Sequence, residues 1–486
     1  MHNGVRTTWA DLDAAVDAAA KGLRESVGLQ QGDRVGIALS NTPDFVTAYF
    51  GVLRAGLVAV PLNTGYTSRE LARLLGEADA RAVLTEASTH SAVAEAMTDS
   101  ACTLVDSAGL TALVEAGGDA GKFEAPTGGE DLAVLLFTSG TSGRPKGAML
   151  SHRALLANLE QCARLEPTPM RDDDVVLLVL PLFHIYGLNA GLGMVARTGA
   201  TAVLVERFDP RATLELVQRE SVTNIPGAPP MYVAWVHLDD QGGAAIDLSA
   251  ALRSVRLLAS GASPLPPAVL EQLRASAGVD INEGYGLTET APVVSSTLGS
   301  DRIKPGSVGK PIPGVELRLV DEAGADVQDD DAGEIWVRGE NLFSGYWPDG
   351  SDGPDEQGWY ATGDVAYADE DGDLFLVGRR KELVLVSGFN VYPREIEEAI
   401  GEHPDVVESA VIGVPHPQTG EAVKAYVVAR PGSGLRAEDI TAHCAERLAR
   451  FKRPTIVELV PELPHSVTGK VAKGRLRAET ARHPAP

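Results

Sequence analysis

Short apolar runs alternate with segments of helical spacing in the first part of the chain. The runs at residues 34–39, 57–62 and 81–85 have the length of buried strands. Between them, residues 42–55 and 68–75 place apolar side chains three and four positions apart, as in an amphipathic helix. Similar apolar runs return at residues 202–205, 255–259 and 280–282. Strands that alternate with helices predict parallel βαβ units, so we expect a doubly wound α/β body.

The pattern changes after Gly314, where apolar and polar residues alternate and acidic turns separate the runs. Residues 315–320, 334–338 and 374–377, the last after an Asp371-Gly372 turn, predict antiparallel hairpins. From Arg380 onward, two helices and two strands are expected at residues 393–402, 407–414, 423–429 and 437–448. We therefore predict an α/β protein with a large N-terminal body of doubly wound sheets, a β-barrel-like subdomain and a small α+β C-terminal domain.

Charge supports a boundary near Gly378. The chain has 67 acidic and 42 basic residues and a net charge of −25, which argues against a nucleic-acid partner. Residues 380–486 contain 15 basic and 14 acidic residues, whereas 27 basic and 53 acidic residues precede them. Because the C-terminal part is far less acidic, we place the body at residues 1–378 and the C-terminal domain at residues 384–486.

The sequence favours a cytoplasmic protein. Its most apolar windows are of strand length, well short of the roughly 20 residues that a membrane helix needs, so no membrane span is expected. The N-terminus lacks the basic stretch and apolar run of a secretory signal. Cys102, Cys162 and Cys444 are far apart and show no CxxC spacing, which favours a reducing compartment.

A glycine- and hydroxyl-rich segment at residues 138–147 directly follows the apolar run 132–137. Small residues let backbone N–H groups face a polyanion closely, hydroxyls donate further hydrogen bonds, and Lys146 adds a positive charge. The segment therefore predicts a phosphate-binding loop rather than an ordinary connection. It is not a Walker A loop, because Pro145 stands where that motif needs glycine, which excludes a P-loop phosphotransferase.

The loop resembles the signature of the acyl-adenylate-forming superfamily, which includes acyl-CoA synthetases, nonribosomal adenylation domains and firefly luciferase. Six further segments resemble the other motifs of this superfamily in the same order. They are the histidine motif, the nucleotide and magnesium motif, the ribose motif, the hinge, the segment after the hinge and the catalytic-lysine motif, at residues 181–187, 285–290, 360–364, 378–382, 388–397 and 464–470. Seven motifs in the correct order identify the chain as a member.

This resemblance assigns roles to residues of the body. The phosphate loop contributes Thr138, Ser139, Gly140, Thr141, Ser142 and Lys146. The adenine and the acyl entrance are assigned to Ser260, Gly261, Ala262, Glu283, Gly284, Tyr285 and Gly286. Thr288 is expected to donate to the α-phosphate, and Glu289 supplies the oxygen ligand that Mg²⁺ prefers. In isolation, a histidine between Phe183 and Ile185 is more typical of a protein core than of a functional site. The resemblance instead implies that His184 gates the acyl tunnel or orients the carboxylate.

The resemblance also assigns roles near the C-terminus. Asp364 and Arg379 would bind the ribose, and Lys381 lies in the predicted hinge at residues 379–383. Lys470 would bridge the substrate carboxylate and the α-phosphate, where negative charge accumulates during adenylation. A mobile C-terminal domain would then rotate about the hinge and bring Gly388 to the tunnel of the thiol acceptor.

The resemblance implies an AMP-forming acid:CoA ligase that uses ATP, Mg²⁺ and coenzyme A. The chain ends 16 residues after Lys470, where a nonribosomal module would continue into a carrier domain, so free CoA is the expected acceptor. A stand-alone enzyme that loads a separate carrier protein stays open, and luciferase-like oxidation has no support in the sequence. The alternative from another class is a non-catalytic nucleotide-binding homologue, which the presence of Lys470, Glu289 and Asp364 argues against. A homodimer is possible.

The expected acyl pocket is mostly small or apolar. Residues 186–193, 227–232 and 291–293 are expected to line it, which suits a monoacid with a hydrophobic body. Malonate-type ligases of the family tend to have an arginine just before the motif tyrosine, whereas Glu283 and Gly284 precede Tyr285 here. We therefore expect a medium- or long-chain fatty acid, with aryl or cyclic acids second. Residues 7–12 resemble a segment that normally follows a longer leader, so the chain is expected to start short.

Overall fold

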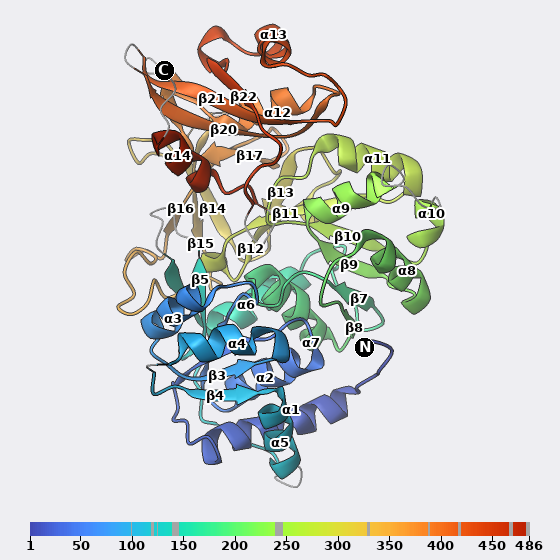
Figure 1. The fold of residues 1–486 in the computed structure, drawn as a ribbon, viewed down its shortest axis with the longest axis vertical. Coiled ribbons are helices and arrows are strands. Elements are labelled where there is room, and N and C mark those ends of the chain that lie inside the picture. The colour runs from blue at the N-terminus through green and yellow to red at the C-terminus, as the bar shows by residue number, and fades with distance from the viewer. Residues whose placement is uncertain are drawn as a thin grey trace. The chain divides into compact units, whose positions relative to one another are not determined.

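The computed structural model describes residues 1–98, 100–117, 121–123, 125–138, 145–238, 246–327, 331–386, 389–416, 419–465 and 470–482 (Figure 1). The described residues form two compact units. The first contains those within Met1–Gly140, Arg144–Glu316 and Val337–Tyr360, and the second those within Leu317–Trp336 and Ala361–Pro486.

The first unit begins with a six-stranded sheet in the order β4-β3-β1-β2-β5-β6. These strands are β1 (Arg34–Ala38), β2 (Val58–Pro61), β3 (Ala80–Thr85), β4 (Thr103–Asp106), β5 (Leu132–Thr138) and β6 (Lys146–Ser151). Neighbouring strands are parallel, except that β5 and β6 are antiparallel. Every residue of β2 is buried, which explains its continuous apolar run.

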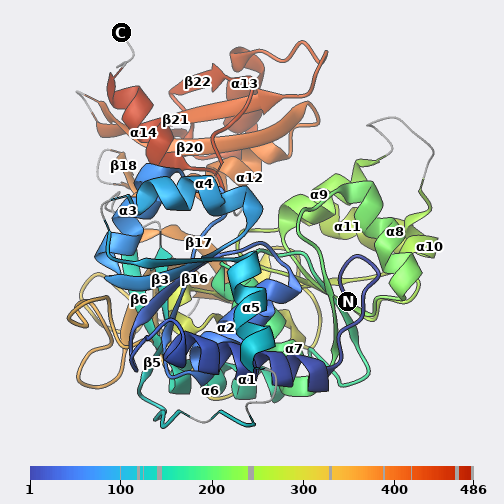
Figure 2. The same ribbon diagram turned by 60° about the horizontal axis from the view of Figure 1, so that its bottom comes forward.

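Helices cover both faces of this sheet. They are α1 (Trp9–Glu25), α2 (Pro43–Arg54), α3 (Ser68–Glu77), α4 (Ala87–Ala96) and α5 (Ser107–Gly117). Helices α3 and α4 lie on one face and α1, α2 and α5 on the other (Figures 1 and 2). Threonine side chains accept from backbone N–H groups at the start of α1, α2 and α3, so local sequence sets where these helices begin.

A second set of strands in the first unit follows the order β8-β7-β9-β10-β11-β12-β13. They are β7 (Val175–Leu178), β8 (Thr201–Leu204), β9 (Asn224–Gly227), β10 (Leu257–Ser260), β11 (Ile281–Gly286), β12 (Val293–Ser296) and β13 (Ser307–Pro311). Strands β7 to β11 pair in parallel, whereas β12 is antiparallel to β11 and to β13. The parallel strands therefore present their carboxyl ends at one edge, where α/β proteins commonly bind ligands.

The helices around this second set are mostly short. They are α6 (His152–Ala163), the π-helix η1 (Tyr186–Gly193), α7 (Met194–Thr198), α8 (Pro210–Glu220), α9 (Pro229–Val236), α10 (Leu248–Ala251) and α11 (Pro267–Ala277). Two 3₁₀ turns, η3 (Thr288–Thr290) and η4 (Thr297–Gly299), flank β12. Buried side chains of α8, α9 and α11, among them Leu214, Trp235 and Leu270, form one core with Leu177 and Leu258 of the strands.

The second unit consists of four neighbouring strands, of which β16 (Tyr360–Ala368) and β17 (Leu374–Arg379) are antiparallel, followed by a smaller α+β part. The first strands are β14 (Glu316–Val320), β15 (Gly333–Arg338), β16 (Tyr360–Ala368) and β17 (Leu374–Arg379), which neighbour one another in this order. A further sheet contains β18 (Val384–Val386), β19 (Phe389–Val391), β20 (Val406–His416), β21 (Gly420–Ala429) and β22 (Ile456–Leu459). Around it lie η5 (Arg380–Glu382), α12 (Pro393–Gly401), α13 (Ala437–Arg447), η6 (Arg450–Lys452) and α14 (Lys473–Arg482).

The predicted fold class is confirmed, with a large α/β body and a smaller C-terminal α+β part. The predicted strands and helices agree with the observed ones to within a few residues; for example, the strand expected at residues 57–62 is Val58–Pro61. The hinge and the domain limits remain predictions. None of the helices in the described part of the chain has the length and apolar character that crossing a membrane requires.

Candidate active site

The two ends of the predicted phosphate loop lie side by side. Thr138 ends β5, Lys146 begins β6, and the two are register partners in this antiparallel pair. The Thr138 hydroxyl donates to the carbonyl oxygen of Lys146 at 3.4 Å. The strand pair therefore holds the loop between two fixed ends, whereas Ser139, Gly140, Thr141 and Ser142 lie outside the described residues.

The ammonium group of Lys146 has two partners in the first unit. Its Nζ lies 2.6 Å from Oδ2 of Asp352 and 4.8 Å from the centre of the Tyr346 ring. The Asp352 carboxylate is exposed, with 66% of its side-chain surface accessible. An exposed ion pair contributes little to stability, so Lys146 can leave Asp352 for a phosphate at small cost.

Glu289 lies in the 3₁₀ turn η3 and is 8% exposed. Its Oε1 accepts a hydrogen bond of 2.6 Å from the hydroxyl of Tyr346. Burial, together with the negative charge of Glu289, raises the pKa of Tyr346 well above its ordinary value, so the phenol stays protonated and acts as donor. Asn341 fixes the same turn, because its side chain donates to the carbonyl oxygen of Thr290 at 2.8 Å.

This arrangement fits a magnesium ligand. A carboxylate supplies the hard oxygen donor that Mg²⁺ prefers, and the described contacts of Glu289 include a phenol, which brings no opposing charge to it. Thr288, one residue earlier, is half-buried and carries the hydroxyl that was assigned to the α-phosphate.

The residues assigned to the adenine lie at the end of β10 and within the neighbouring parallel strand β11. Ser260 of β10 and Glu283 of β11 are register partners and are both buried. The Ser260 hydroxyl oxygen has no hydrogen-bond partner among the described residues, although it is buried. A buried hydroxyl without a partner is costly, so this atom suits a ligand that would bond to it.

Glycines in this region allow close backbone approaches. A Cβ added at Gly286 would lie 1.9 Å from the carbonyl oxygen of Pro292, and one at Gly284 would lie 3.2 Å from that of Ser295. A Cβ added at Gly261 would lie 3.1 Å from the ring of Tyr186. Ala262 has a φ of +71°, which is unusual for a residue other than glycine. Tyr285 is 8% exposed, so packing accounts for most of its surface.

His184 lies directly before η1 and is half-buried. The backbone N–H of Tyr186 donates to its Nδ1 at 3.3 Å. A neutral imidazole that accepts at Nδ1 carries its proton on Nε2, so the ring can present an N–H donor at that atom. The role of His184 at the acyl tunnel stays a prediction.

The second unit contains the remaining predicted residues. Asp364 of β16 and Arg379 of β17 are register partners, and Nε of Arg379 lies 2.9 Å from Oδ1 of Asp364. The predicted ribose pair is therefore brought together. Lys381 lies in η5 and Lys470 follows β22, and both are exposed. Gly388 lies outside the described residues.

Comparison with known proteins assigns the chain to a family. Residues 1–347 match the AMP-binding enzymes, and residues 395–470 match the C-terminal domain of AMP-binding enzymes. The chain belongs to this family.

Similar proteins cover nearly the whole chain. The long-chain-fatty-acid–CoA ligase of Yersinia pestis is 35% identical over 518 residues, which span 99% of this chain and 91% of that protein. The feruloyl-CoA synthase of an Amycolatopsis species is 37% identical over 492 residues, or 98% of this chain and 94% of that protein. ATP-bound MatB from Rhodopseudomonas palustris is 33% identical with a TM-score of 0.90, covering 99% and 95% of the two chains. The predicted superfamily and enzyme class, an AMP-forming acid–thiol ligase, are confirmed.

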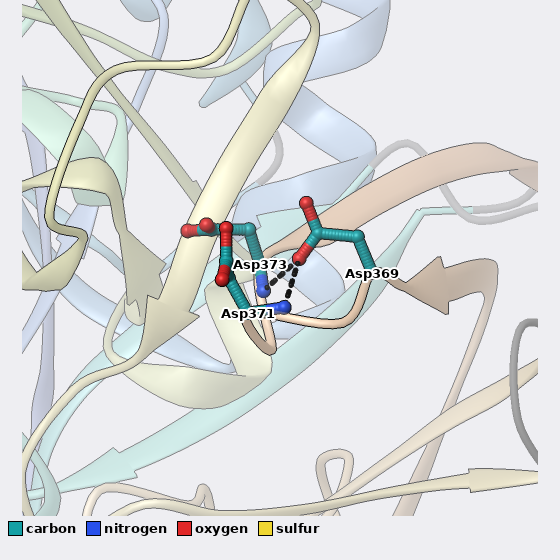
Figure 3. A group of neighbouring side chains, drawn as sticks. All are labelled: Asp369, Asp371 and Asp373. Atoms are coloured by element: carbon teal, nitrogen blue, oxygen red, sulfur yellow. Dashed lines mark hydrogen bonds between the residues drawn. The ribbon is translucent and has the colours of Figure 1, made fainter.

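A group of three aspartates also lies in the second unit. Asp369, Asp371 and Asp373 occupy the turn between β16 and β17 with their carboxylate oxygens close together (Figure 3). One oxygen of Asp369 accepts from the backbone N–H groups of Asp371 and Asp373, each at 3.0 Å. Gly372 completes this turn with a φ of +81°, so hairpin geometry accounts for the cluster.

Sequence reasoning missed Tyr346, Asp352 and Asn341. They lie in a segment that none of the seven motifs includes, and they contact motif residues far away in the chain; Tyr346 and Glu289 are 57 positions apart. The available signal was the run Ser344-Gly-Tyr-Trp-Pro348, whose adjacent aromatic residues stand between glycine and proline.

Proposed function

We propose that this chain joins a medium- or long-chain fatty acid to coenzyme A through an acyl-adenylate. The observation that carries the proposal is the contact network of the first unit, in which Tyr346 contacts both Lys146 of the phosphate loop and Glu289 of the magnesium motif. A site for a nucleoside triphosphate needs two groups, a cation for the phosphates and a carboxylate for the metal ion.

In the first half-reaction, an oxygen of the fatty-acid carboxylate attacks the α-phosphorus of ATP. The bond from this phosphorus to the bridging oxygen breaks, and pyrophosphate leaves. Two anions must approach, so positive charge and aligned donors lower the barrier. We assign Lys146 to the leaving phosphates, the Thr288 hydroxyl to the α-phosphate, and Lys470 to the oxygens between which the new bond forms.

Glu289 would hold Mg²⁺, which supplies charge neutralisation of the phosphates when it is bound. Ser260 and Glu283 would face the adenine, and the Asp364 carboxylate would accept from the ribose hydroxyls. The polar atoms at both places suit these roles, since the Ser260 hydroxyl is buried without a partner and Asp364 is already aligned by Arg379.

In the second half-reaction, the sulfur of coenzyme A attacks the acyl carbonyl carbon as the thiolate. The bond between this carbon and the phosphate oxygen breaks, and AMP leaves. We assign the entry of the thiol to the segment around Gly388 after rotation about Lys381, as the family resemblance implies. Loading of a separate carrier protein is the alternative for this step.

An aryl acid is the second candidate substrate. The feruloyl-CoA synthase relative names such a substrate for that protein, and it is 37% identical over 98% of this chain. In the predicted acyl pocket, the Tyr186 ring packs closely on Gly261, and the Tyr232 ring packs on Gly227 while its hydroxyl donates to Ala259 at 2.7 Å. Such rings form flat walls, which suit a planar acid.

A pyrophosphate-release screen tests the function and separates these candidates. We would measure release with a series of straight-chain acids from acetate to stearate and with benzoate, coumarate and ferulate, each with and without coenzyme A. Greatest kcat/KM for a medium or long chain supports the first candidate, and greatest kcat/KM for an aromatic acid supports the second. No acid-dependent release with any of them would overturn the proposal. A homodimer and a cytoplasmic location remain predictions.

A further inference from the structure

Tyr346 contacts both charged groups of the candidate nucleotide site through different parts of one side chain. Its hydroxyl donates to Oε1 of Glu289 at 2.6 Å, and the Nζ of Lys146 lies 4.8 Å from the centre of its ring. All three residues belong to the first unit. Tyr346 lies in none of the seven motifs, so the family resemblance stated above gives it no role.

The backbone around Tyr346 is fixed on two sides. Trp347 N–H donates to the carbonyl oxygen of Gly147 at 2.8 Å, which ties the segment to β6 directly beside Lys146. Phe343 N–H donates to the carbonyl oxygen of Glu289 at 2.9 Å, which ties it to η3. The Phe343 ring also meets the Tyr346 ring edge to face at 5.1 Å. These contacts leave the phenol little freedom, so its direction is set before any ligand binds.

The chemistry of a phenol suits this position. A phenol is uncharged at neutral pH, so its hydrogen bond orients a carboxylate without neutralising it. A lysine or arginine in its place would compensate the charge of Glu289 and weaken the attraction of a cation to it. The bond occupies Oε1 and leaves Oε2 of the same carboxylate for a metal.

The same ring also holds Lys146 by its face, through a cation–π contact. Asp352 contacts the ammonium as well, at 2.6 Å. Asp352 and the Tyr346 ring therefore hold the Lys146 ammonium without an ion pair to Glu289, although Tyr346 contacts both charged residues. A direct pair between them would remove from the site both the cation meant for phosphate and the anion meant for the metal.

We propose that Tyr346 is a positioning residue that orients the Glu289 carboxylate for Mg²⁺ and keeps the Lys146 ammonium apart from it. This inference rests on the proposed function, because it takes Glu289 as a magnesium ligand and Lys146 as a phosphate ligand. In this role Tyr346 acts through the two charged residues and not on the reacting atoms.

The test is the affinity for ATP, measured by titration calorimetry without acid or coenzyme A, once with Mg²⁺ and once with EDTA. In Tyr346→Phe, which keeps the ring and removes the hydroxyl, we expect the gain in affinity on adding Mg²⁺ to fall by about tenfold, as for other outer contacts of metal ligands. Affinity in EDTA should stay unchanged. Tyr49→Phe removes a buried phenol of α2 and serves as the matched control, with an unchanged magnesium gain.

A double variant separates positioning from a general structural effect. Glu289→Gln should abolish the magnesium gain, and Tyr346→Phe combined with Glu289→Gln should lose nothing further, because the hydroxyl acts through that carboxylate. An equal loss of ATP affinity with Mg²⁺ and with EDTA in Tyr346→Phe, or additive losses in the double variant, would overturn the proposal. A full magnesium gain in Glu289→Gln would overturn it as well, whereas the ligase function is judged independently by pyrophosphate release.

Discussion

Gly286 lies at the end of β11, where the chain turns into η3 and reaches Glu289. A Cβ at this position would lie 1.9 Å from the carbonyl oxygen of Pro292 and 2.7 Å from its carbonyl carbon. Both atoms belong to the backbone, which has no rotamer to change, so β11 and β12 would have to separate. The requirement for glycine at this motif position is therefore one of space.

We predict that Gly286→Ala lowers the free energy of unfolding by about 3 kcal/mol, as overpacking does elsewhere. It should also reduce acid-dependent pyrophosphate release, because η3 carries both Thr288 and Glu289. Thermal unfolding and the release assay measure the two effects. The control is Gly76→Ala on α3, where an added Cβ meets nothing within 4 Å and an exposed helical alanine should stabilise by up to about 1 kcal/mol. Full activity in Gly286→Ala would show that η3 does not need glycine at this position to hold Thr288 and Glu289.

At the residue scale, sequence predicts chemistry where neighbours in the chain supply it together. Thr138 and Lys146, or Asp364 and Arg379, stand in motifs whose residue types already indicate a phosphate or a sugar, and the structure places each pair side by side. Tyr346 could not be found in this way. Its role depends on contacts with residues far from it along the chain, and packing alone brings these together.

Among the elements, strands β7, β9 and β10 begin around a buried charge. Asp174, just before β7, is 2% exposed, and its carboxylate accepts from Nε of Arg256 at 2.8 Å, from the Thr223 hydroxyl at 2.7 Å and from Arg171 N–H at 2.8 Å. Burial alone would raise the pKa of Asp174, but the hydrogen bonds from Arg256, Thr223 and Arg171 lower it overall. The ionised carboxylate thus joins the starts of neighbouring elements.

We predict that Arg256→Met destabilises the protein by about 3–5 kcal/mol at neutral pH, because it leaves a buried carboxylate without its cation. A carboxyl group whose pKa is lower in the folded protein than in the unfolded chain stabilises the fold fully above its unfolded-state pKa. This stabilisation is lost as the pH falls through the folded-state pKa. The difference between wild type and variant should therefore shrink below about pH 4. Urea-unfolding midpoints across this range measure it.

Arg197→Met provides the control for this pair. Arg197 contacts Glu160 at 2.8 Å, but the Glu160 side chain is 54% exposed, so removal of this cation should cost less than about 1 kcal/mol at any pH. Equal effects of the two substitutions, or a pH-independent deficit in Arg256→Met, would show that the Asp174 cluster does not stabilise these strands through its charge.

Helices and strands were predictable where one local sequence pattern was strong. The fully buried strand β2 and the capped helix α3 follow from an apolar run and from Thr67 followed by Glu70. The π-helix η1 was not foreseen, because a wider helical turn leaves the apolar composition of residues 186–193 unchanged. A Cβ at Gly187 would lie 2.5 Å from the carbonyl oxygen of Pro181, so the start of this helix packs tightly against the segment that leads into it. Such a contact leaves no periodic trace in the sequence.

At the scale of the whole molecule, the two proposed half-reactions, adenylation and thioester formation, require different residues near the C-terminus. In the proposed mechanism, adenylation brings two anions together and uses the Lys470 ammonium, whereas thioester formation begins from an acyl-adenylate that is already activated. We predict that Lys470→Ala lowers acid-dependent pyrophosphate release by about 100- to 1,000-fold and leaves conversion of supplied acyl-AMP with coenzyme A largely intact.

Separate assays of the two half-reactions provide the measurement for Lys470→Ala. Arg475→Ala is the matched control, since this exposed cation lies five positions further along, in α14, and no role is assigned to it. Equal loss in both half-reactions of Lys470→Ala would refute the assignment of Lys470 to adenylation.

The opposite defect is expected at Gly388, which family resemblance places on the path of the thiol. If the thiol passes beside Gly388, a tryptophan there would obstruct its path, so Gly388→Trp should slow thioester formation from supplied acyl-AMP while acid-dependent pyrophosphate release persists. Gly388→Ala adds a single methyl group and should give a smaller defect of the same kind. If Gly388→Trp left the overall rate unchanged, the path would lie elsewhere. Opposite defects in Lys470→Ala and Gly388→Trp would mean that the C-terminal domain uses different residues in the two half-reactions. That result is expected if the domain rotates between them, because each rotation state would bring its own residue to the reacting groups.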